Sequence, residues 1–360
     1  MRGKYQTIYD NFYYRFERGI YRIMRNIRMT RKYLRYNPGP EFQEAYKNTI
    51  LPYWKQFGIK PKKHWAMYYY KMTGTLDPRY IPDDIHYYYI IPHFDNMVYV
   101  RPLEDKNLYS LLFHDIKRPE TIFKYVDGQY YTDNFALLSK AEALSLCSTG
   151  EFIVKPTTDT GQGSGIRFFS GMPAEDVDTL LSSYKDVDYI VQKVLAQHPS
   201  LARFNPTSLN TVRVVSFFFK GEVHILSAIL RIGPEGSRVD NISKGGYQAV
   251  IQPDGSLKKL AYTHLNGTHA YVPQTASGIP FENFVIPSWE KLVETVKTAA
   301  LRLPHLKIIG WDIAIDENSE INLVEFNCLF GPNQENCGPT FGDMTDEVLS
   351  EVFAKKKPKR

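Results

Sequence analysis

Three oxygen-bearing side chains, those of Asp312, Glu325 and Asn327, have the types and the spacing of a cation site. They fall in two apolar–polar alternating segments, residues 310–316 and 323–327, which predict half-buried strands joined by a turn. Glu325 and Asn327 are two residues apart, so their side chains leave one face of a strand, and Asp312 on the partner strand can join them. Mg²⁺ prefers such oxygen ligands, with phosphate oxygens and water completing its shell. A solvated hairpin face is the alternative interpretation.

A glycine-rich loop upstream has the composition of a phosphate-binding segment. The apolar run 152–154 ends at Lys155, a loop with three glycines and several hydroxyl groups follows over residues 157–165, and residues 166–169 predict another strand. Glycines let backbone N–H groups approach phosphate oxygens closely, and the lysine adds a positive charge. The loop lacks the P-loop spacing and no helix pattern follows it, so a P-loop NTPase is disfavoured. An ordinary hairpin loop is the alternative.

In their order along the chain, these and other segments resemble the ATP-grasp superfamily from about residue 105 to about residue 327. Asp105-Lys106 resembles the pair that opens the central lobe of D-alanine–D-alanine ligases. Residues 189–195 resemble the interlobe segment whose backbone hydrogen-bonds adenine, and residues 210–215 resemble a strand of the ribosomal-protein glutamate ligases. The runs Glu-Asp-Lys-Asn-Leu, Asn-Thr-Val-Arg and Gly-Trp-Asp suggest that the nearest subgroup is the sugar-transfer associated ATP-grasp proteins, which accompany polysaccharide biosynthesis.

The resemblance implies ATP as cofactor and a complete set of site residues. The metal ligands would be Asp312, Glu325 and Asn327, holding two Mg²⁺ ions, with Mn²⁺ as a possible substitute. The groups that act near the transferred phosphate would be Arg213, Arg231, Asn241 and Lys244. The groups that bind ATP would be Lys106, Lys155, Thr160, Gly161, Gly163, Ser164, Gly165, Gln192, Lys193, Val194, Leu195 and His198.

Some of these positions depart from the pattern of the superfamily. Gln192 replaces a common glutamate, and Asn210 replaces an acidic residue that is common before the strand arginine. The acid that often holds the ribose hydroxyls has no clear match, and Gln197 or His198 is placed to substitute for it. The loop over residues 160–165 would be a lid that closes over the nucleotide.

The implied fold class is α+β, an ATP-grasp fold in which two α+β lobes clasp ATP between antiparallel sheets, with an N-terminal helical extension. We expect a basic amphipathic extension, an aromatic-rich lobe, a central lobe with the lid, a C-terminal lobe with the metal site and a basic tail. Their expected bounds are residues 1–58, 59–104, 105–200, 201–350 and 351–360.

Three functional classes are open at this point. The first is an ATP- and Mg²⁺-dependent carboxylate–amine ligase that works through an acyl phosphate, in polysaccharide or cell-surface glycan biosynthesis, on a small-molecule or glycan-precursor substrate. The second is a sugar or small-molecule kinase of the same fold. The third is a nucleotide-binding scaffold in a glycan assembly complex, which the intact set of Asp312, Glu325, Asn327, Lys106 and Lys155 disfavours.

Charge and composition bear on the partners and the compartment. Residues 1–36 hold ten basic and two acidic residues in an amphipathic helix pattern, and residues 355–360 hold five more basic residues. The helix pattern suits an anionic membrane surface, an anionic glycan, a partner protein or simple packing on the body, whereas nucleic acid is disfavoured because no recognition module accompanies the charge. Three cysteines, no long apolar run and no signal-peptide core favour a cytoplasmic enzyme, with peripheral association at the inner membrane face as an option.

Other segments give predictions of secondary structure. Phe42, Tyr46, Ile50, Tyr53 and Phe57 recur at helical spacing, as do apolar residues after Pro287. Residues 60–99 are rich in tyrosine and proline, which favours an aromatic core under a lobe of short strands over a sugar-stacking surface. His264 and His269 are expected in a loop, either inert or binding substrate or acting as a base.

Overall fold

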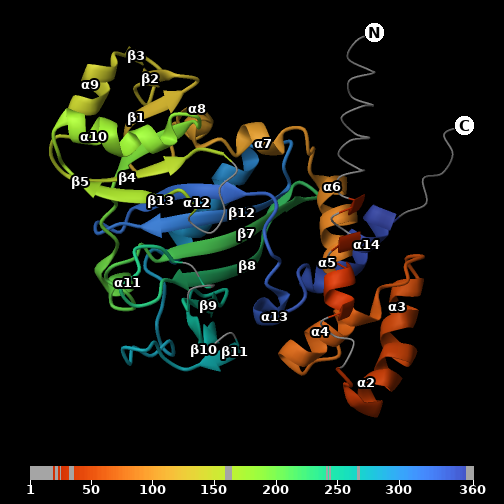
Figure 1. Cartoon of the computed structure of the whole chain (residues 1–360). Helices are drawn as coiled ribbons and strands as arrows, with labels where there is room; N and C mark the ends of the chain where they lie inside the picture. The colour runs from red at the N-terminus through yellow and green to blue at the C-terminus, as the bar shows by residue number, and fades with distance from the viewer. Residues whose placement is uncertain are drawn as a thin grey trace, which may run out of the picture. The chain divides into compact units, whose positions relative to one another are not determined.

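The computed structural model describes residues 19–20, 23–24, 26–31, 36–158, 164–240, 242, 245–265 and 268–353. Contacts divide the chain into two compact units (Figure 1). We call Met1–Asn96 with Gly331–Arg360 the helical unit, and Met97–Phe330 the two-sheet unit. Among the described helices, none is long and apolar enough to cross a membrane.

The helical unit contains short helices and no strand among its described residues. Its elements are α2 (Gly39–Ala45), η1 (Tyr46–Ile50), α3 (Leu51–Lys55), α4 (Lys63–Thr73), α5 (Asp83–Ile85), η2 (His86–Ile90), α6 (Ile91–Phe94), α13 (Gln334–Cys337), η6 (Gly342–Met344) and α14 (Thr345–Phe353). The predicted lobe of short strands over residues 60–99 is therefore wrong. Trp65 and Tyr69 lie four residues apart on one face of α4, and both are buried, so burial on a helical face outweighs the strand preference of aromatic residues.

The helix predicted over residues 42–57 is confirmed, with a change in its buried face. Phe42, Tyr46, Ile50 and Trp54 are buried, whereas Tyr53 and Phe57 are only half-buried. The π-helical turn η1 lies in the middle of this helix and adds a residue to the turn, which carries the buried face from position 53 to position 54.

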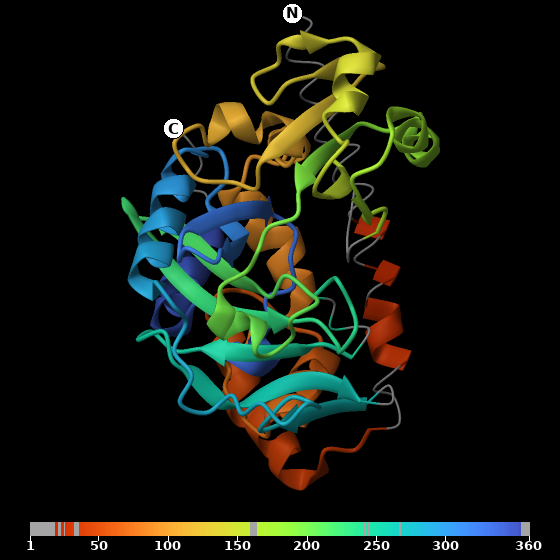
Figure 2. The ribbon, with the colours of Figure 1, turned by 90° about the vertical axis from the view of Figure 1, so that its left-hand side faces the viewer.

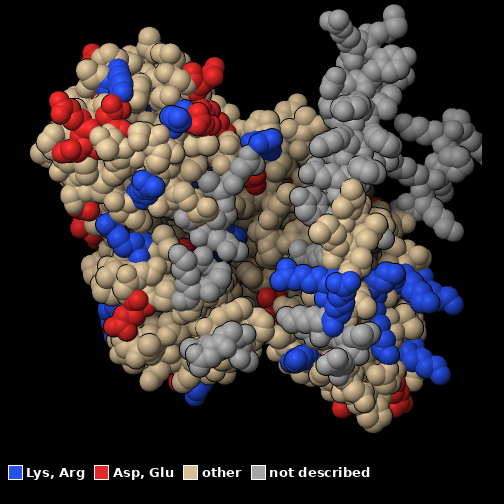
Figure 3. Space-filling model, viewed as in Figure 1, with Lys and Arg blue, Asp and Glu red and all other residues tan. Residues whose placement is uncertain are grey.

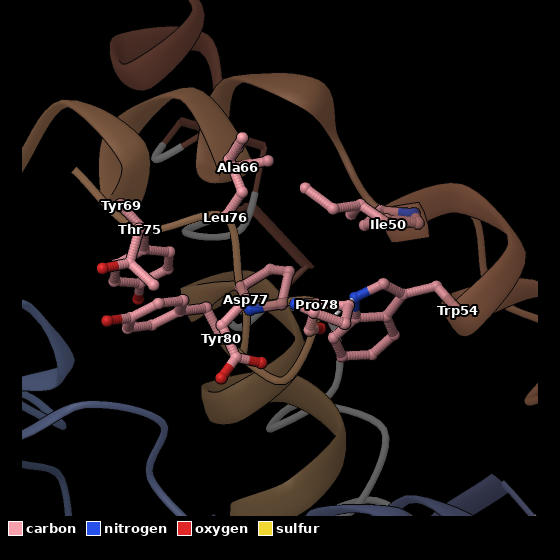
Figure 4. Close-up of a pocket in the computed structure, with 11 residues that line it drawn as sticks. Ile50, Trp54, Ala66, Tyr69, Thr75, Leu76, Asp77, Pro78 and Tyr80 are labelled. Carbon is pink, nitrogen blue, oxygen red and sulfur yellow. Dashed lines mark hydrogen bonds between the residues drawn. The ribbon is translucent and has the colours of Figure 1, made fainter. Parts of the chain in front are cut away.

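A small cavity in the helical unit is lined in part by aromatic residues (Figure 4). Trp54, Tyr69 and Tyr80 line it, and the rings of Tyr69 and Tyr80 stack with centroids 4.9 Å apart. Its volume of about 20 Å³ has room for about one water molecule and not for a sugar ring. Trp54 and Tyr69 are buried in the core, and Tyr80 is half-buried.

At its C-terminal end the chain divides into units differently from the predicted domain bounds. Residues 331–350, expected in the C-terminal lobe, group with the helical unit. The buried side chain of Gln334 explains this grouping, because its amide donates to Tyr69 Oη at 2.7 Å and accepts from the Ile81 N–H at 2.8 Å.

The two-sheet unit begins with short helical turns and a six-stranded antiparallel sheet in the order β3-β2-β1-β6-β4-β5. Its elements are α7 (Val100–Leu103), η3 (Lys106–Leu108), α8 (Tyr109–Leu112), β1 (Thr121–Val126), β2 (Gln129–Tyr131), β3 (Leu137–Leu138), α9 (Lys140–Ser145), β4 (Glu151–Pro156), β5 (Arg167–Ser170), α10 (Ala174–Leu181), η4 (Ser182–Tyr184) and β6 (Tyr189–Lys193). The helices α9 and α10 share one apolar core with this sheet. Ser139 and Glu142 form a capping box that begins α9.

A seven-stranded antiparallel sheet follows in the order β11-β10-β9-β8-β7-β12-β13. Its elements are α11 (Pro199–Ala202), β7 (Thr211–Phe219), β8 (Glu222–Ile232), β9 (Tyr247–Ile251), β10 (Leu257–Leu265), β11 (Thr268–Val272), α12 (Trp289–Leu301), β12 (Ile308–Ile315) and β13 (Ile321–Asn327). The predicted helix after Pro287 is confirmed as α12, which packs on the apolar face of this sheet (Figure 2).

Two strand predictions need correction. The strand with Asp312 was expected to be half-buried, but every residue of β12 is buried. The face opposite α12 is also covered there, since a Cβ at Gly310 would lie 2.9 Å from the ring of Phe330. His264 and His269, expected in a loop, are directly paired residues of the β10–β11 hairpin.

Basic and acidic side chains also gather on separate parts of the described surface. Lys and Arg side chains gather on the face of the helical unit that Figure 3 shows, and acidic side chains gather over α9 and α10. Exposed lysines of the helical unit include Lys47, Lys55, Lys60, Lys62 and Lys63. The basic pattern of residues 1–36 lies mostly outside the described residues, and the tail 355–360 lies entirely outside them.

Candidate ATP and metal site

Pairing of three strands brings the predicted metal ligands and one predicted arginine together. In the register of β12 with β13, Asp312 lies opposite Glu325, and Gly310 lies opposite Asn327. On its other side β12 pairs with β7, where Arg213 lies opposite Asp312. Cross-strand partners in an antiparallel sheet have side chains on the same face. Glu325, Asp312 and Arg213 therefore form one row across the sheet.

The carboxylate of Asp312 is held by two arginines. Arg213 donates from Nε to Oδ1 at 2.5 Å and from Nη2 to Oδ2 at 2.7 Å, and Arg231 donates from Nη1 to Oδ2 at 3.0 Å. Burial alone would raise the pKa of Asp312, but the two guanidinium groups outweigh it and hold the pKa well below its usual range. Asp312 thus stays ionised across the physiological range.

A second carboxylate, that of Asp240, also pairs with Arg231, and the sequence did not predict it. Asp240 Oδ1 accepts from Arg231 Nη2 at 3.1 Å, and the hydroxyl of Thr211 donates to the other oxygen. Burial raises the pKa of Asp240, and Arg231 opposes that shift. In the sequence, the only clue to Asp240 was its place directly before Asn241. Its position beside Arg231 follows from the tertiary structure alone.

Lys106 and Lys155, the two lysines predicted to bind phosphate, both lie near Glu325. Lys106 Nζ lies 3.3 Å from Glu325 Oε2, and both lysine ammonium groups are close enough to Glu325 to interact with its charge. Thr157 connects the two lysine-bearing segments: its carbonyl accepts from the Lys106 N–H at 3.3 Å, and its hydroxyl accepts from Asn107 Nδ2 at 3.3 Å. Asp105 begins the η3 turn by accepting from the Asn107 N–H at 2.9 Å. The structure therefore places Lys106 and Lys155, both predicted by the resemblance, next to the same carboxylate, that of Glu325.

Lys155 makes the site sensitive to pH. Burial, and then the charge of Lys106, lower the pKa of Lys155 from 10.5 to about 8, against the attraction of Glu325. Between these two values the unfolded chain binds the proton and the folded chain does not, so this group makes stability rise with pH across that window. Phosphate oxygens favour the charged ammonium, so we expect an ATP analogue to bind at pH 9 with uptake of a proton.

Calorimetry in two buffers of different ionisation enthalpy measures this proton uptake. Lys155→Met should weaken analogue binding and abolish most of the uptake, whereas Lys297→Met on the exposed face of α12 should change neither. Equal proton uptake by wild type and Lys155→Met would show that Lys155 does not face the phosphates. Lys106→Met should also weaken binding.

The donor set fits a hard cation. A carboxylate has about four lone-pair sites, and Asp312 uses three of them on guanidinium groups, which leaves one on Oδ1. The buried amide Nδ2 of Asn327 has no hydrogen-bond partner among the described residues. As a donor it would suit a phosphate oxygen, and only the amide oxygen of Asn327 could hold the cation. The described residues contain no group of three or more His, Cys, Asp and Glu side chains around one point. Two carboxylates and one amide oxygen would hold Mg²⁺ only together with phosphate oxygens.

The predicted adenine-binding segment lies at the end of β6, next to the seven-stranded sheet. The N–H groups of Lys193 and Val194 are used within the protein, donating to Glu120 O at 2.9 Å and Glu151 O at 2.8 Å. The Leu195 N–H donates to none of the described residues, which makes it the available donor of this segment. Gln192 is buried and donates from Nε2 to Pro119 O at 3.4 Å.

The two candidates for the ribose differ in what holds them. The side chain of Gln197 binds backbone groups of Asn205, Ser208 and Asn210, so it stabilises a loop and is not available to ribose. His198 uses Nδ1 to accept from the Ser200 N–H at 3.2 Å at the start of α11. Of the side-chain atoms of Gln197 and His198, His198 Nε2 is therefore the candidate to bind a ribose hydroxyl.

Several predicted residues lie outside the described part of the chain. These are Thr160, Gly161 and Gly163 of the lid, and Asn241 and Lys244 near the phosphate. Ser164 and Gly165 are described. Gly165 has φ +73°, and Tyr184 Oη donates to its carbonyl at 2.6 Å.

Gly165→Ala should destabilise the two-sheet unit. A Cβ there would lie 2.8 Å from Pro156 Cγ, in addition to the backbone strain of an L-residue at positive φ. Gly236→Ala is a matched control, because Gly236 has φ +75° and no heavy atom within 4 Å of the added Cβ. Urea denaturation should show a loss of about 1–2 kcal/mol for the control and a larger loss for Gly165→Ala. Equal losses would rule out the contact with Pro156.

The fold has two antiparallel sheets, and carboxylates, arginines and two lysines gather at one end of the second sheet. The family model described as Sugar-transfer associated ATP-grasp matches residues 89–334, more than half of the chain. This chain therefore belongs to the sugar-transfer associated ATP-grasp family, as the resemblance predicted. No curated protein matches the sequence.

Solved structures are similar only at low identity. They include L-amino acid ligase from Bacillus licheniformis, with 10% identity, a TM-score of 0.38 and coverage of 70% of this chain and 47% of that chain. Biotin carboxylase from Campylobacter jejuni has 12% identity, a TM-score of 0.42 and coverage of 73% and 48%. VanG D-Ala:D-Ser ligase from Enterococcus faecalis has 13% identity, a TM-score of 0.42 and coverage of 70% and 61%. The chain spans less than two thirds of the length of each.

Proposed function

We propose that this protein is an ATP- and Mg²⁺-dependent ligase that joins a carboxylate to an amine through an acyl phosphate, in the biosynthesis of a polysaccharide or cell-surface glycan. The observation that carries the proposal is the single row of Glu325, Asp312 and Arg213, with Lys106 on one side and Arg231 on the other. The family's description as sugar-transfer associated supports the glycan role.

The charges of this row suit transfer of a phosphoryl group. Lys106 and Lys155 would neutralise the phosphates of ATP, and a divalent cation held by Asp312, Glu325 and Asn327 would supply further positive charge at the phosphate oxygens. Arg213 and Arg231 lie beside the carboxylate of Asp312 and would stabilise negative charge on the transferring group. Lysines and arginines on both sides of the metal ligands hold ATP and the acceptor in line.

The proposed reaction has two steps. A carboxylate oxygen of the acceptor attacks the γ-phosphorus, and the bond to the β-phosphate oxygen breaks, which releases ADP. The nitrogen of an amine then attacks the acyl carbon, inorganic phosphate leaves, and the amine loses a proton to give the amide. Exclusion of water protects the acyl phosphate between the steps.

Trapping with hydroxylamine tests this function without knowledge of the natural amine. The full chain is incubated with ATP, Mg²⁺, hydroxylamine and a panel of carboxylates, and hydroxamate, ADP and phosphate are measured. A ligase gives hydroxamate, ADP and phosphate in equal amounts for at least one carboxylate. A phosphorylated acceptor without free phosphate would make the protein a kinase, and binding of ATP with no turnover on any acceptor would make it a scaffold.

A further inference from the structure

The first helical residues of the helical unit that the structure describes have large apolar side chains on the outside. Every described residue between positions 19 and 31 is helical. The side chains of Ile20, Ile23, Met24 and Ile27 are exposed, by 45%, 60%, 60% and 46%. Their spacing is i, i+3, i+4 and i+7, so they lie within about 100° of one another around the helix. We call these four residues the apolar stripe.

Another side of the same helix is attached to the protein through polar side chains. Asn26 Oδ1 accepts from Trp65 Nε1 at 3.1 Å and lies 3.1 Å from His64 Nε2, both on α4. Asn26 Nδ2 donates to Asp84 Oδ2 at 3.2 Å. One turn further on, Thr30 Oγ1 lies 3.1 Å from His64 Nδ1. Hydrogen bonds therefore join this helix to α4.

The proton on His64 gives these hydrogen bonds a fixed direction. Burial, and then the charge of Lys62, lower the pKa of His64 from 6.5 to about 4, so the ring is neutral at pH 7. The amide oxygen of Asn26 can only accept, so His64 Nε2 carries the proton and His64 Nδ1 accepts from the hydroxyl of Thr30. These bonds fix the rotation of the helix about its axis, and with it the direction of the apolar stripe.

The arrangement differs from that of a helix that only covers a core. Such a helix buries its apolar residues and leaves its polar residues in water. Here Asn26 and Thr30 contact α4, whereas the apolar stripe is exposed. Single exposed apolar side chains are ordinary, but four adjacent ones on two turns of helix mark an interaction surface.

Charge indicates what binds to this surface. Residues 18–32 contain six basic residues and no acidic residue, and two of the six, Arg28 and Arg31, are described and exposed. Arg31 follows Ile27 by four residues, so a cation continues the line of the apolar stripe. A second copy of this chain would bring like charges together, which is unfavourable. An anionic lipid bilayer offers both an apolar interior for the stripe and negative headgroups for the arginines.

The length of the apolar stripe suits binding along a membrane surface. From Ile20 to Ile27 the helix rises about 10 Å, whereas the hydrocarbon core of a bilayer is about 30 Å thick. A helix that lies in the plane of the interface can insert its apolar side chains while the long stems of its arginines extend toward the lipid phosphates.

We propose that the helical residues between positions 19 and 31 form a docking surface for an anionic lipid bilayer. The apolar stripe enters the interface, and Arg28 and Arg31 bind lipid phosphates. The inference does not rest on the proposed function, because none of these residues belongs to the two-sheet unit.

Sedimentation of the full chain with lipid vesicles tests the proposal. Vesicles of phosphatidylglycerol and phosphatidylcholine in equal parts are compared with vesicles of phosphatidylcholine alone, at low ionic strength. We expect binding to the anionic vesicles to be at least about tenfold stronger. No binding to the anionic vesicles, or equal binding to both kinds, would overturn the proposal. Binding to dextran sulfate without binding to vesicles would overturn it in favour of an anionic glycan.

A double variant tests the apolar stripe. Ile23→Gln with Met24→Gln removes its two most exposed side chains and keeps the charge and the helix propensity. Binding to anionic vesicles should fall at least about tenfold, with unchanged melting and unchanged affinity for an ATP analogue. Leu137→Gln with Leu301→Gln is the matched control, because both leucines are similarly exposed in the two-sheet unit, and it should bind like wild type. Undiminished binding by the folded stripe variant would contradict the assignment.

A second double variant tests the charges. Arg28→Gln with Arg31→Gln should weaken binding to anionic vesicles roughly 30-fold. Lys185→Gln with Lys258→Gln removes two exposed cations from the two-sheet unit and should have little effect. An equal loss in both double variants would mean that net charge governs binding, which would overturn the assignment to this helix.

Discussion

Replacing Glu325 with glutamine should reduce ATP turnover at least about 100-fold while the protein stays folded. Glu325 lies opposite Asp312 in the pairing of β12 with β13 and 3.3 Å from Lys106, so the proposed metal site and the proposed phosphate site both depend on its carboxylate. Glutamine keeps the shape of the side chain but removes the charge that a divalent cation requires. Steady-state release of ADP at saturating Mg²⁺ measures the effect.

The turn of the same hairpin provides the control for this change. Glu317→Gln alters an exposed carboxylate between the two strands and should leave turnover unchanged. Circular dichroism and a melting curve check that Glu325→Gln is folded. Near-normal Mg²⁺-dependent turnover by a folded Glu325→Gln protein would contradict the metal assignment.

Replacing Asp312 with asparagine should both abolish turnover and destabilise the protein. Asp312 is 4% exposed and pairs with Arg213 and Arg231, whose side chains are 16% and 21% exposed. Without this charge, the two buried guanidinium groups lose the carboxylate that they share. The free energy of unfolding should therefore fall by about 3 kcal/mol at pH 7. Asp240 still pairs with Arg231 and limits the loss.

The pH dependence of this destabilisation is specific to an ion pair. The folded-state pKa of Asp312 is depressed, so its contribution is present above the unfolded pKa of about 3.9 and is lost as pH falls through the folded value. The difference in melting temperature between wild type and Asp312→Asn should therefore stay constant from pH 7 to about pH 5 and narrow as pH falls below about 3.9. Asp186→Asn, in an exposed turn, should melt like wild type throughout. A difference that stays constant over the whole range would mean that packing, not charge, is lost.

Local pattern was enough to predict several parts of the fold. The structure confirms three elements that the spacing of apolar residues predicted. They are the hairpin over residues 310–327, the strand after the glycine-rich loop and the helix after Pro287. Glu325 and Asn327 could be placed on one face because strand geometry fixes that relation between residues two apart. Lys106 and Lys155, by contrast, were linked only by resemblance, since no local rule joins residues 49 positions apart.

Long-range register was the part that the sequence could not provide. Arg213 lies beside Asp312 although 99 residues separate them, and Asp240 supports Arg231 from a loop that has no local signature. The pairing of His264 with His269 was missed although the sequence signals a hairpin there, since Asn266-Gly267 separates two segments rich in aromatic and β-branched residues. The π turn after Ala45 shifted a buried face by one residue, an effect that an ideal helical period cannot show.

Transfer of labelled oxygen is the most direct test of an acyl-phosphate ligase. The best acceptor from the hydroxamate panel is prepared with ¹⁸O in its carboxylate and incubated with ATP, Mg²⁺ and hydroxylamine, and the products are examined by phosphorus NMR. The account predicts inorganic phosphate that carries one ¹⁸O from the carboxylate, in equal amount to the ADP. Phosphate without the label, or a phosphorylated acceptor with no free phosphate, would contradict it.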